Sequence, residues 1–187
     1  MTTVTLYLDR LDAVIFDVDS IVKGTAEAHV YGDTVRVLRE LRLRYVPTAA
    51  VSSSRHRVQV LHSAGVAGLL DVRVDGADLD RLGLPGKPFP AAYQEAARRL
   101  GARPAGCAVV EDAVAGVRAG HTGGFGVVIG VDRGGDLAGA LYDAGATVVV
   151  SSMSDVLLVE RTPLRLVQAR RGQADAVWND RPVIWSQ

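Results

Sequence analysis

Residues 13–20 read AVIFDVDS, and this stretch indicates the fold class. Four apolar residues in a row, two of them β-branched, are typical of a strand buried on both faces of a parallel sheet. The strand leads into Asp17 and Asp19, which point to the same side because side chains alternate along an extended chain. Two such carboxylates could carry out phosphoryl transfer, with Asp17 as nucleophile and Asp19 as general acid and base. The simpler interpretation is that strand ends commonly carry aspartate in turns.

Further apolar runs alternate with helical patterns along the chain. In residues 34–43, for example, Val35, Leu38 and Leu41 recur at helical spacing. The alternation predicts an α/β fold with a doubly wound, Rossmann-like parallel sheet and right-handed crossovers. In such a sheet, ligands bind beyond the carboxyl ends of the strands. The expected strands are residues 13–16, 48–51, 72–74, 108–110, 127–129 and 147–150, and the expected helices are residues 34–43, 90–100, 114–119, 137–144 and 154–159.

The composition indicates one globular domain without an unusual surface. The chain has 187 residues, of which 48% are hydrophobic, and its 21 basic and 21 acidic residues balance. This balance argues against nucleic acid or a charged membrane surface as a partner. We expect no membrane span and no secretory signal. The single cysteine, Cys107, excludes an internal disulfide and lies in an apolar run, so we expect a buried residue in a cytoplasmic protein.

A second polar cluster, Ser52-Ser53-Ser54-Arg55-His56, follows the expected strand at residues 48–51. Ser52 could hold a phosphate oxygen because a helix N-terminus favours anions, although serine is also simply a good helix cap. We take Ser53, Ser54, Arg55 and His56 as candidates for substrate binding. For His56, an ordinary polar role is the simpler alternative.

Two further motifs complete the set of candidates. Lys87 stands between a glycine and a proline in a chain with only two lysines, and its ammonium could neutralise a phosphate; the alternative is an ordinary solvated lysine. Glu111 and Asp112 follow the expected strand at residues 108–110. Adjacent acids there are costly unless a cation or a donor satisfies them, and hard oxygen ligands suit Mg²⁺.

Taken in order, these motifs resemble the haloacid dehalogenase-like (HAD) superfamily, and most of all its β-phosphoglucomutase-like sugar-phosphatase branch. The resemblance covers about residues 11–159 and implies a three-layer α/β/α core. The matching segments read IFDVD (15–19), TAEAH (25–29), VSSSR (51–55), VDG (74–76), GKP (86–88), VEDAVAG (110–116) and IGVDR (129–133).

The resemblance also implies a role for each candidate. Asp17 would be phosphorylated and would bind Mg²⁺, while Asp19 would protonate the leaving group and offer a backbone carbonyl to the metal. Ser52 and Lys87 would bind the phosphoryl group. Asp112, together with Glu111, would complete the metal site.

The chain departs from this branch in one major respect. Relatives carry a helical cap of several dozen residues before the second strand, whereas here His29 is followed almost at once by the expected helix at residues 34–43. Such a cap closes over the substrate and excludes water. Its loss implies an open site for a phosphorylated small molecule, including a bulky one, or a lid supplied by a second subunit, a partner or the tail. Gly24, where relatives carry an acid, and Ser20, where glycine is commonest, are smaller departures.

We therefore expect a core at residues 1–160, with residues 161–187 as a C-terminal tail or the start of a following region, and a hairpin turn at Asn179-Asp180. The leading hypothesis is a Mg²⁺-dependent phosphatase. The alternatives are a binding or regulatory module with an idle site and, disfavoured by the missing cap, a sugar-phosphate mutase.

Overall fold

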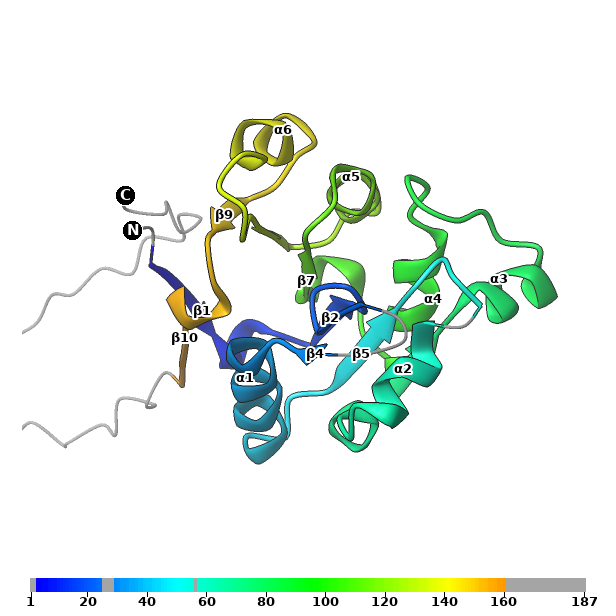
Figure 1. The fold of residues 1–187 in the computed structure, drawn as a ribbon, viewed down its shortest axis with the longest axis horizontal. Helices are drawn as coiled ribbons and strands as arrows, with labels where there is room; N and C mark the ends of the chain where they lie inside the picture. The colour runs from blue at the N-terminus through cyan, green and yellow to red at the C-terminus, as the bar shows by residue number, and fades with distance from the viewer. Residues whose placement is uncertain (1–2, 25–28, 56, 161–187) are drawn as a thin grey trace, which may run out of the picture.

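A six-stranded parallel sheet forms the centre of the molecule (Figure 1). The computed structural model describes residues 3–24, 29–55 and 57–160. The strands lie in the order β6-β5-β2-β7-β8-β9, so the chain winds outward from β2 in both directions. This order confirms the predicted doubly wound α/β fold. The strands of this sheet are β2 (Ala13–Asp17), β5 (Thr48–Val51), β6 (Val72–Val74), β7 (Cys107–Glu111), β8 (Val127–Val131) and β9 (Val148–Val150).

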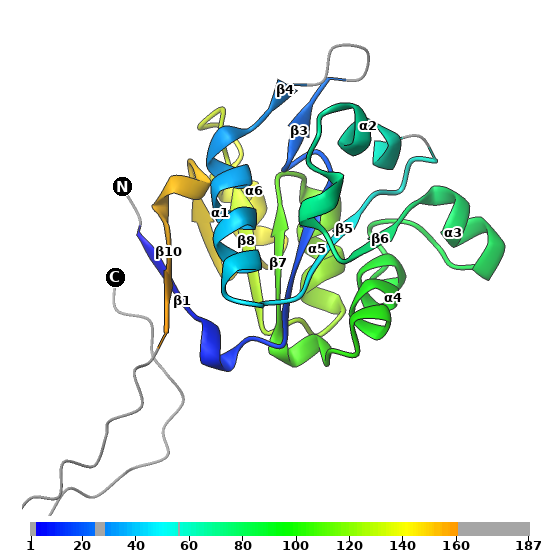
Figure 2. The ribbon, with the colours of Figure 1, turned by 90° about the horizontal axis from the view of Figure 1, so that it is seen from below.

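Helices cover both faces of the sheet, as Figures 1 and 2 show. On one face, Val35, Leu38 and Leu41 of α1 pack into a buried cluster together with Leu61 of α2. On the other face, residues of α3, α4, α5 and α6 fill a second cluster. The helical spacing read from residues 34–43 is therefore the spacing of a core-facing surface. The helices are α1 (Gly32–Leu43), α2 (Arg57–Ser63), α3 (Gly76–Leu82), α4 (Ala91–Leu100), α5 (Val114–Thr122) and α6 (Ala138–Asp143).

One expected helix is wrong. Residues 154–159 form a short 3₁₀ turn and then strand β10 (Val156–Val159), which pairs in parallel with β1 (Val4–Tyr7). Val156 and Leu158 are buried while Leu157 is half exposed, which is the alternation of a strand with one covered face. The partner strand lies about 150 residues earlier in the chain. Local periodicity could not reveal that pairing, and β1 itself was not expected.

A small antiparallel hairpin follows β2 at the carboxyl edge of the sheet (Figure 2). It consists of β3 (Val22–Lys23) and β4 (His29–Val30), and α1 begins two residues after β4. Between β2 and β5, the described residues form this hairpin and α1 and contain no helical domain. The hairpin thus lies at the same edge of the sheet as the carboxyl end of β2.

The remaining expectations concern the chain ends and the membrane. Among the helices in the described part of the chain, none has both the length and the apolar character needed to cross a bilayer. The tail at residues 161–187, with its expected turn at Asn179-Asp180, lies outside the described residues.

Candidate active site

Asp17 lies at the middle of the carboxyl edge of the sheet. It is the last residue of β2, a strand buried along its whole length, and is itself only 5% exposed. Its Oδ2 accepts a 2.6 Å hydrogen bond from the N–H of Asp19, and its Oδ1 contacts the ammonium of Lys87. Because β2 pairs with β5 and β7, Ser52 follows the strand on one side and Glu111 ends the strand on the other.

Glu111 is the last residue of β7 and is fully buried. Its Oε1 accepts hydrogen bonds from the ammonium of Lys87 and, at 2.9 Å, from the hydroxyl of Tyr93. Its Oε2 accepts a 2.8 Å hydrogen bond from the N–H of Ala113. The side chain has room only because Gly116 of α5 lacks one, since a methyl group there would overlap the carboxylate. Every oxygen of this buried anion is thus satisfied.

The carboxylates of Asp17, Glu111 and Asp112 converge. Each offers an oxygen within 4.8 Å of the others. The ammonium of Lys87 joins two of them, Asp17 and Glu111. When all four groups are ionised, three negative charges face one positive charge, which leaves an excess of two. A divalent cation would balance this excess, and hard carboxylate oxygens are the donors that Mg²⁺ prefers.

The electrostatics agree with a crowded anionic site. Burial raises the pKa of Glu111 above its ordinary value, and the charge of Asp17 acts in the same direction, against the lowering effect of Lys87. Burial and the charge of Asp17 likewise raise the pKa of Asp112. Burial alone would lower the pKa of Lys87, but its two carboxylate neighbours raise it. Lys87 therefore stays protonated, while the acids resist full ionisation unless more positive charge is present.

The serines of the second cluster lie at the end of the neighbouring strand. Ser52 is buried, and its Oγ accepts a 3.2 Å hydrogen bond from the N–H of Ser54. Ser53 is exposed, and its Oγ lies 3.5 Å from the backbone N of Lys87. The structure thus brings Ser52, Ser53 and Lys87 to the same edge as Asp17.

Two other described candidates, Arg55 and Asp19, are exposed. Arg55 is largely exposed, and its guanidinium forms a 2.5 Å ion pair with Asp80 of α3. His56 lies outside the described residues. The side chain of Asp19 is half exposed, and its carboxylate pairs with the guanidinium of Arg57, the first residue of α2.

Two residues at this site were not anticipated from the sequence. Tyr93, on the buried face of α4, donates to Glu111, and the Lys87 ammonium lies 5.1 Å from the centre of its ring. Burial and the nearby charge of Glu111 raise the pKa of Tyr93 well above its usual value, so the hydroxyl remains a donor. Arg57 continues the Ser-Ser-Ser-Arg-His run, and that continuity was the only available signal for it.

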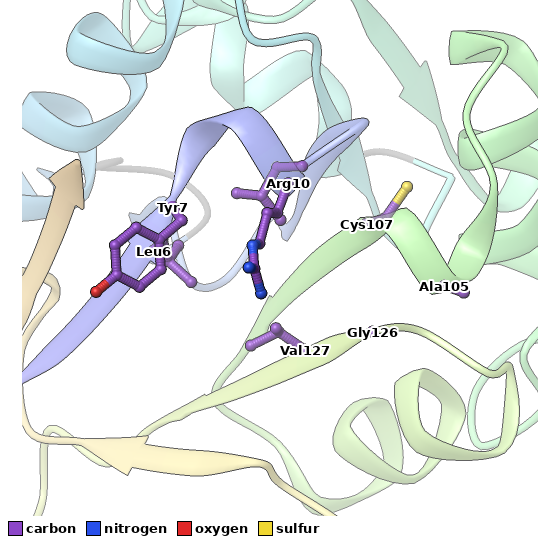
Figure 3. A pocket seen from close by; sticks show the side chains of 8 residues that line it. Leu6, Tyr7, Arg10, Ala105, Cys107, Gly126 and Val127 are labelled. Carbon is purple, nitrogen blue, oxygen red and sulfur yellow. The ribbon is translucent and has the colours of Figure 1, made fainter. Parts of the chain in front are cut away.

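A pocket of about 140 Å³ lies at the opposite end of the sheet (Figure 3). Figure 3 shows Leu6, Tyr7 and Arg10 of the N-terminal segment opposite Val127, the first residue of β8. The lining is mostly apolar and includes Cys107, the first residue of β7. Because this pocket is at the amino ends of the strands, it is separate from the carboxylate cluster at their carboxyl ends.

Comparison with known proteins places the chain among relatives of the same fold. A family model described as haloacid dehalogenase-like hydrolase matches residues 2–124. The chain is 39% identical over 132 residues to a β-phosphoglucomutase of Mycobacterium bovis, covering 70% of this chain and 50% of that protein. It is 33% identical over 158 residues to a trehalose-phosphate phosphatase of Mycobacterium leprae, covering 83% of this chain and 34% of that protein. The chain thus spans half the length of these curated relatives or less.

Solved structures show the same architecture. A HAD family hydrolase of Deinococcus radiodurans, solved with bound phosphate and sodium, superposes with a TM-score of 0.68 at 24% identity, covering 78% of this chain and 93% of that one. A putative β-phosphoglucomutase of Thermotoga maritima superposes with a TM-score of 0.69 at 18% identity, covering 78% of this chain and 96% of that one. At these identities the likeness concerns the fold, while the family model covers most of the present sequence. The chain belongs to the haloacid dehalogenase-like hydrolase family.

Proposed function

We propose that this chain is a Mg²⁺-dependent phosphomonoesterase that works through an aspartyl-phosphate on Asp17. The observation that supports the proposal is the convergence of Asp17, Lys87, Glu111 and Asp112 at the carboxyl edge of the sheet. A carboxylate nucleophile, a fixed cation and a second acidic group at one point are the parts that in-line phosphoryl transfer requires.

In the first step, an oxygen of Asp17 attacks the phosphorus atom and the bond from phosphorus to the leaving oxygen breaks. Asp19, two residues further on, enters this step in its protonated form and gives its proton to that leaving oxygen. In the second step, water attacks the phosphorus of the aspartyl-phosphate, the bond from phosphorus to the Asp17 oxygen breaks, and Asp19 takes up the proton of the water. Inorganic phosphate leaves, and Asp17 and Asp19 return to their starting states.

We infer that two side chains, those of Lys87 and Ser52, bind the phosphoryl group. Lys87 offers a buried ammonium next to Asp17, which offsets the negative charge of the phosphoryl oxygens. The Oγ of Ser52 accepts from the N–H of Ser54, so its own hydroxyl hydrogen can be donated to a phosphoryl oxygen. The remaining candidates, Ser53, Ser54, Arg55 and His56, stay proposed contacts for the rest of the substrate.

The carboxylate cluster suits a divalent metal. Asp17, Asp112 and Glu111 supply hard oxygen donors with an excess of two negative charges over Lys87. The backbone carbonyl of Asp19 is the further donor that the family resemblance implies. When bound, Mg²⁺ would supply positive charge at the phosphoryl oxygens and at Asp17. Of these donors, we expect loss of Asp112, the least buried of the three carboxylates, to weaken metal binding with the smallest disturbance of the fold.

A phosphorylated sugar is the proposed substrate class. The curated relatives named above act, by their names, on a phosphoglucose and on trehalose phosphate. Between β2 and β5, where the branch carries its cap, the described residues form the β3–β4 hairpin and α1. Such an edge would admit a disaccharide phosphate as readily as a monosaccharide phosphate.

The test is phosphate release from p-nitrophenyl phosphate and a panel of sugar phosphates, with Mg²⁺ and with EDTA. We expect metal-dependent release that falls about a thousandfold or more in Asp17→Asn. Asp9→Asn is the matched control, because Asp9 lies in the 3₁₀ turn before the amino end of β2 and should leave turnover unchanged. If a folded, Mg²⁺-binding protein released no more phosphate than Asp17→Asn, the phosphatase proposal would fail and a binding role would replace it.

The same panel separates hydrolysis from mutase activity. A hexose 1-phosphate should give inorganic phosphate and free sugar. Accumulation of the corresponding 6-phosphate would instead indicate a mutase, the activity named for the relative from Mycobacterium bovis.

A further inference from the structure

Arg57 connects helix α2 to the segment that follows Asp17. Its guanidinium contacts three acceptors on that segment, namely the carboxylate of Asp19 and the backbone carbonyls of Val22 and Gly24. The Arg57 side chain is only 14% exposed, whereas that of Asp19 is 50% exposed. A largely buried cation thus holds a carboxylate that is otherwise open to solvent.

The backbone around Asp19 is fixed by local hydrogen bonds, but the side chain is not. The N–H of Asp19 donates to Asp17, and the N–H of Val22 donates to the carbonyl of Val18 at 3.0 Å. None of these bonds determines the rotamer of the Asp19 carboxylate, and a half-exposed aspartate populates several rotamers. Within the described residues, Arg57 is the contact that selects one of them.

We propose that Arg57 is a positioning residue for catalysis, which holds Asp19 and the β3–β4 hairpin in one arrangement above Asp17. This inference rests on the proposed function, because it gives Asp19 the role of general acid. A planar guanidinium suits the task, since its several N–H groups can reach a carboxylate and two carbonyls at once.

The consequence for catalysis depends on the leaving group. Proton transfer requires the acid within hydrogen-bond reach of the leaving oxygen, and a displacement of about 1 Å can cost about a hundredfold in rate. An alkoxide, the leaving group of a sugar phosphate, needs that proton. A p-nitrophenolate leaves without one, so its departure does not depend on where Asp19 lies.

The test compares kcat/KM for a sugar phosphate and for p-nitrophenyl phosphate in wild type, Arg57→Ala and Arg57→Lys. This parameter covers the steps up to departure of the leaving group. In Arg57→Ala we expect a loss of about a hundredfold for the sugar phosphate, carried by kcat, and of less than about tenfold for the aryl phosphate. Arg57→Lys should recover part of the loss. Equal losses for both substrates, or a loss carried by KM alone, would contradict a positioning role.

Arg99→Ala is the matched control for a general loss of stability. Arg99 at the end of α4 is also partly buried, and its guanidinium also contacts two carboxylates and a backbone carbonyl, those of Asp78, Glu95 and Arg73. These contacts lie away from the carboxylate cluster. Arg99→Ala should therefore leave the ratio of the two kcat/KM values unchanged, and a change in the ratio as large as that in Arg57→Ala would overturn the inference.

A second measurement keeps the inference separate from the phosphatase proposal. Amide hydrogen exchange can follow the N–H of Tyr31, which donates to the carbonyl of Ile21 at 2.9 Å and so ties the end of the hairpin to the turn after β2. We expect Arg57→Ala to speed this exchange about tenfold or more, whereas Arg99→Ala should not. Unchanged exchange would overturn the positioning role even in an active enzyme. If the wild-type protein showed no turnover but Arg57→Ala still exchanged this N–H faster than wild type, Arg57 would remain the residue that orders the hairpin. That result would count against the phosphatase proposal alone.

Discussion

Replacing Gly116 by alanine tests how Glu111 is held. A Cβ at position 116 would lie 2.7 Å from Cγ of Glu111 and closer still to its carboxylate, so the acid would have to move. Moving it breaks its contacts with Lys87, Tyr93 and the N–H of Ala113. Disrupting a buried, hydrogen-bonded ion pair costs about 3 to 5 kcal/mol, and alanine returns about 1 kcal/mol in a helix. We expect a net loss of about 2 to 4 kcal/mol in the free energy of unfolding.

Urea denaturation in EDTA measures this loss. The midpoint should fall by about 1 to 2 M with an unchanged m-value. Gly139→Ala is the matched control, because Gly139 also lies in the first turn of a helix, α6, but an added methyl group would meet nothing within 4 Å. Gly139→Ala should raise the free energy of unfolding by up to about 1 kcal/mol. In a Glu111→Ala background, Gly116→Ala should cost little, since the clash is gone. A Gly116→Ala protein as stable as the wild type would refute the steric explanation.

Three further outcomes are expected. Burial opposes ionisation of Asp33, but hydrogen bonds led by Arg133 lower its pKa from 3.8 to about 2. Ionised Asp33 therefore stabilises the fold by about 2 kcal/mol above about pH 5, and this stabilisation is lost as the pH falls toward about 2. Urea titrations should show that the difference in free energy of unfolding between wild type and Asp33→Asn becomes smaller over that range. Tyr93→Phe removes the 2.9 Å hydrogen bond to Glu111 and should cost about 1 to 2 kcal/mol in the same assay. Burial raises the pKa of Cys107 to about 11, so its thiol should react with a disulfide reagent only at the rate of unfolding.

The central sheet could be read from the sequence because its strands are buried on both faces. Most of them, such as β2, β5 and β7, are short runs of mainly apolar residues, and such runs are visible without any knowledge of their partners. The error at residues 154–159 has the opposite cause. β10 and β1 form a separate two-stranded sheet whose pairing joins distant parts of the chain, and a Val-Leu-Leu-Val run is compatible with either helix or strand until the partner is known.

Some residues of the candidate site could likewise be predicted from the sequence, and others could not. Asp17 and Glu111 were predictable because the topology brings the carboxyl ends of neighbouring parallel strands together. Tyr93 and Arg57 were not, because they reach the site from helices. Which face of α4 or α2 points to the sheet edge depends on how each helix is rotated and packed, and the local sequence does not fix that rotation. Arg55 shows the same limit, since it is two residues from Arg57 but pairs with Asp80 of α3.

The parallel pairing of β1 with β10 has a mechanical consequence. Val4 pairs with Val156 and Tyr7 with Val159. Val4, the first residue of β1, and Val159, the last residue of β10, therefore lie at opposite ends of the ladder. A pulling force applied through residues 4 and 159 would slide the two strands along each other and load all of their hydrogen bonds at once. In a hairpin pulled from its open end, the bonds would instead break one after another. When tension reaches this domain through its ends, the ladder therefore resists it before the sheet that carries Asp17 and Glu111 is disturbed.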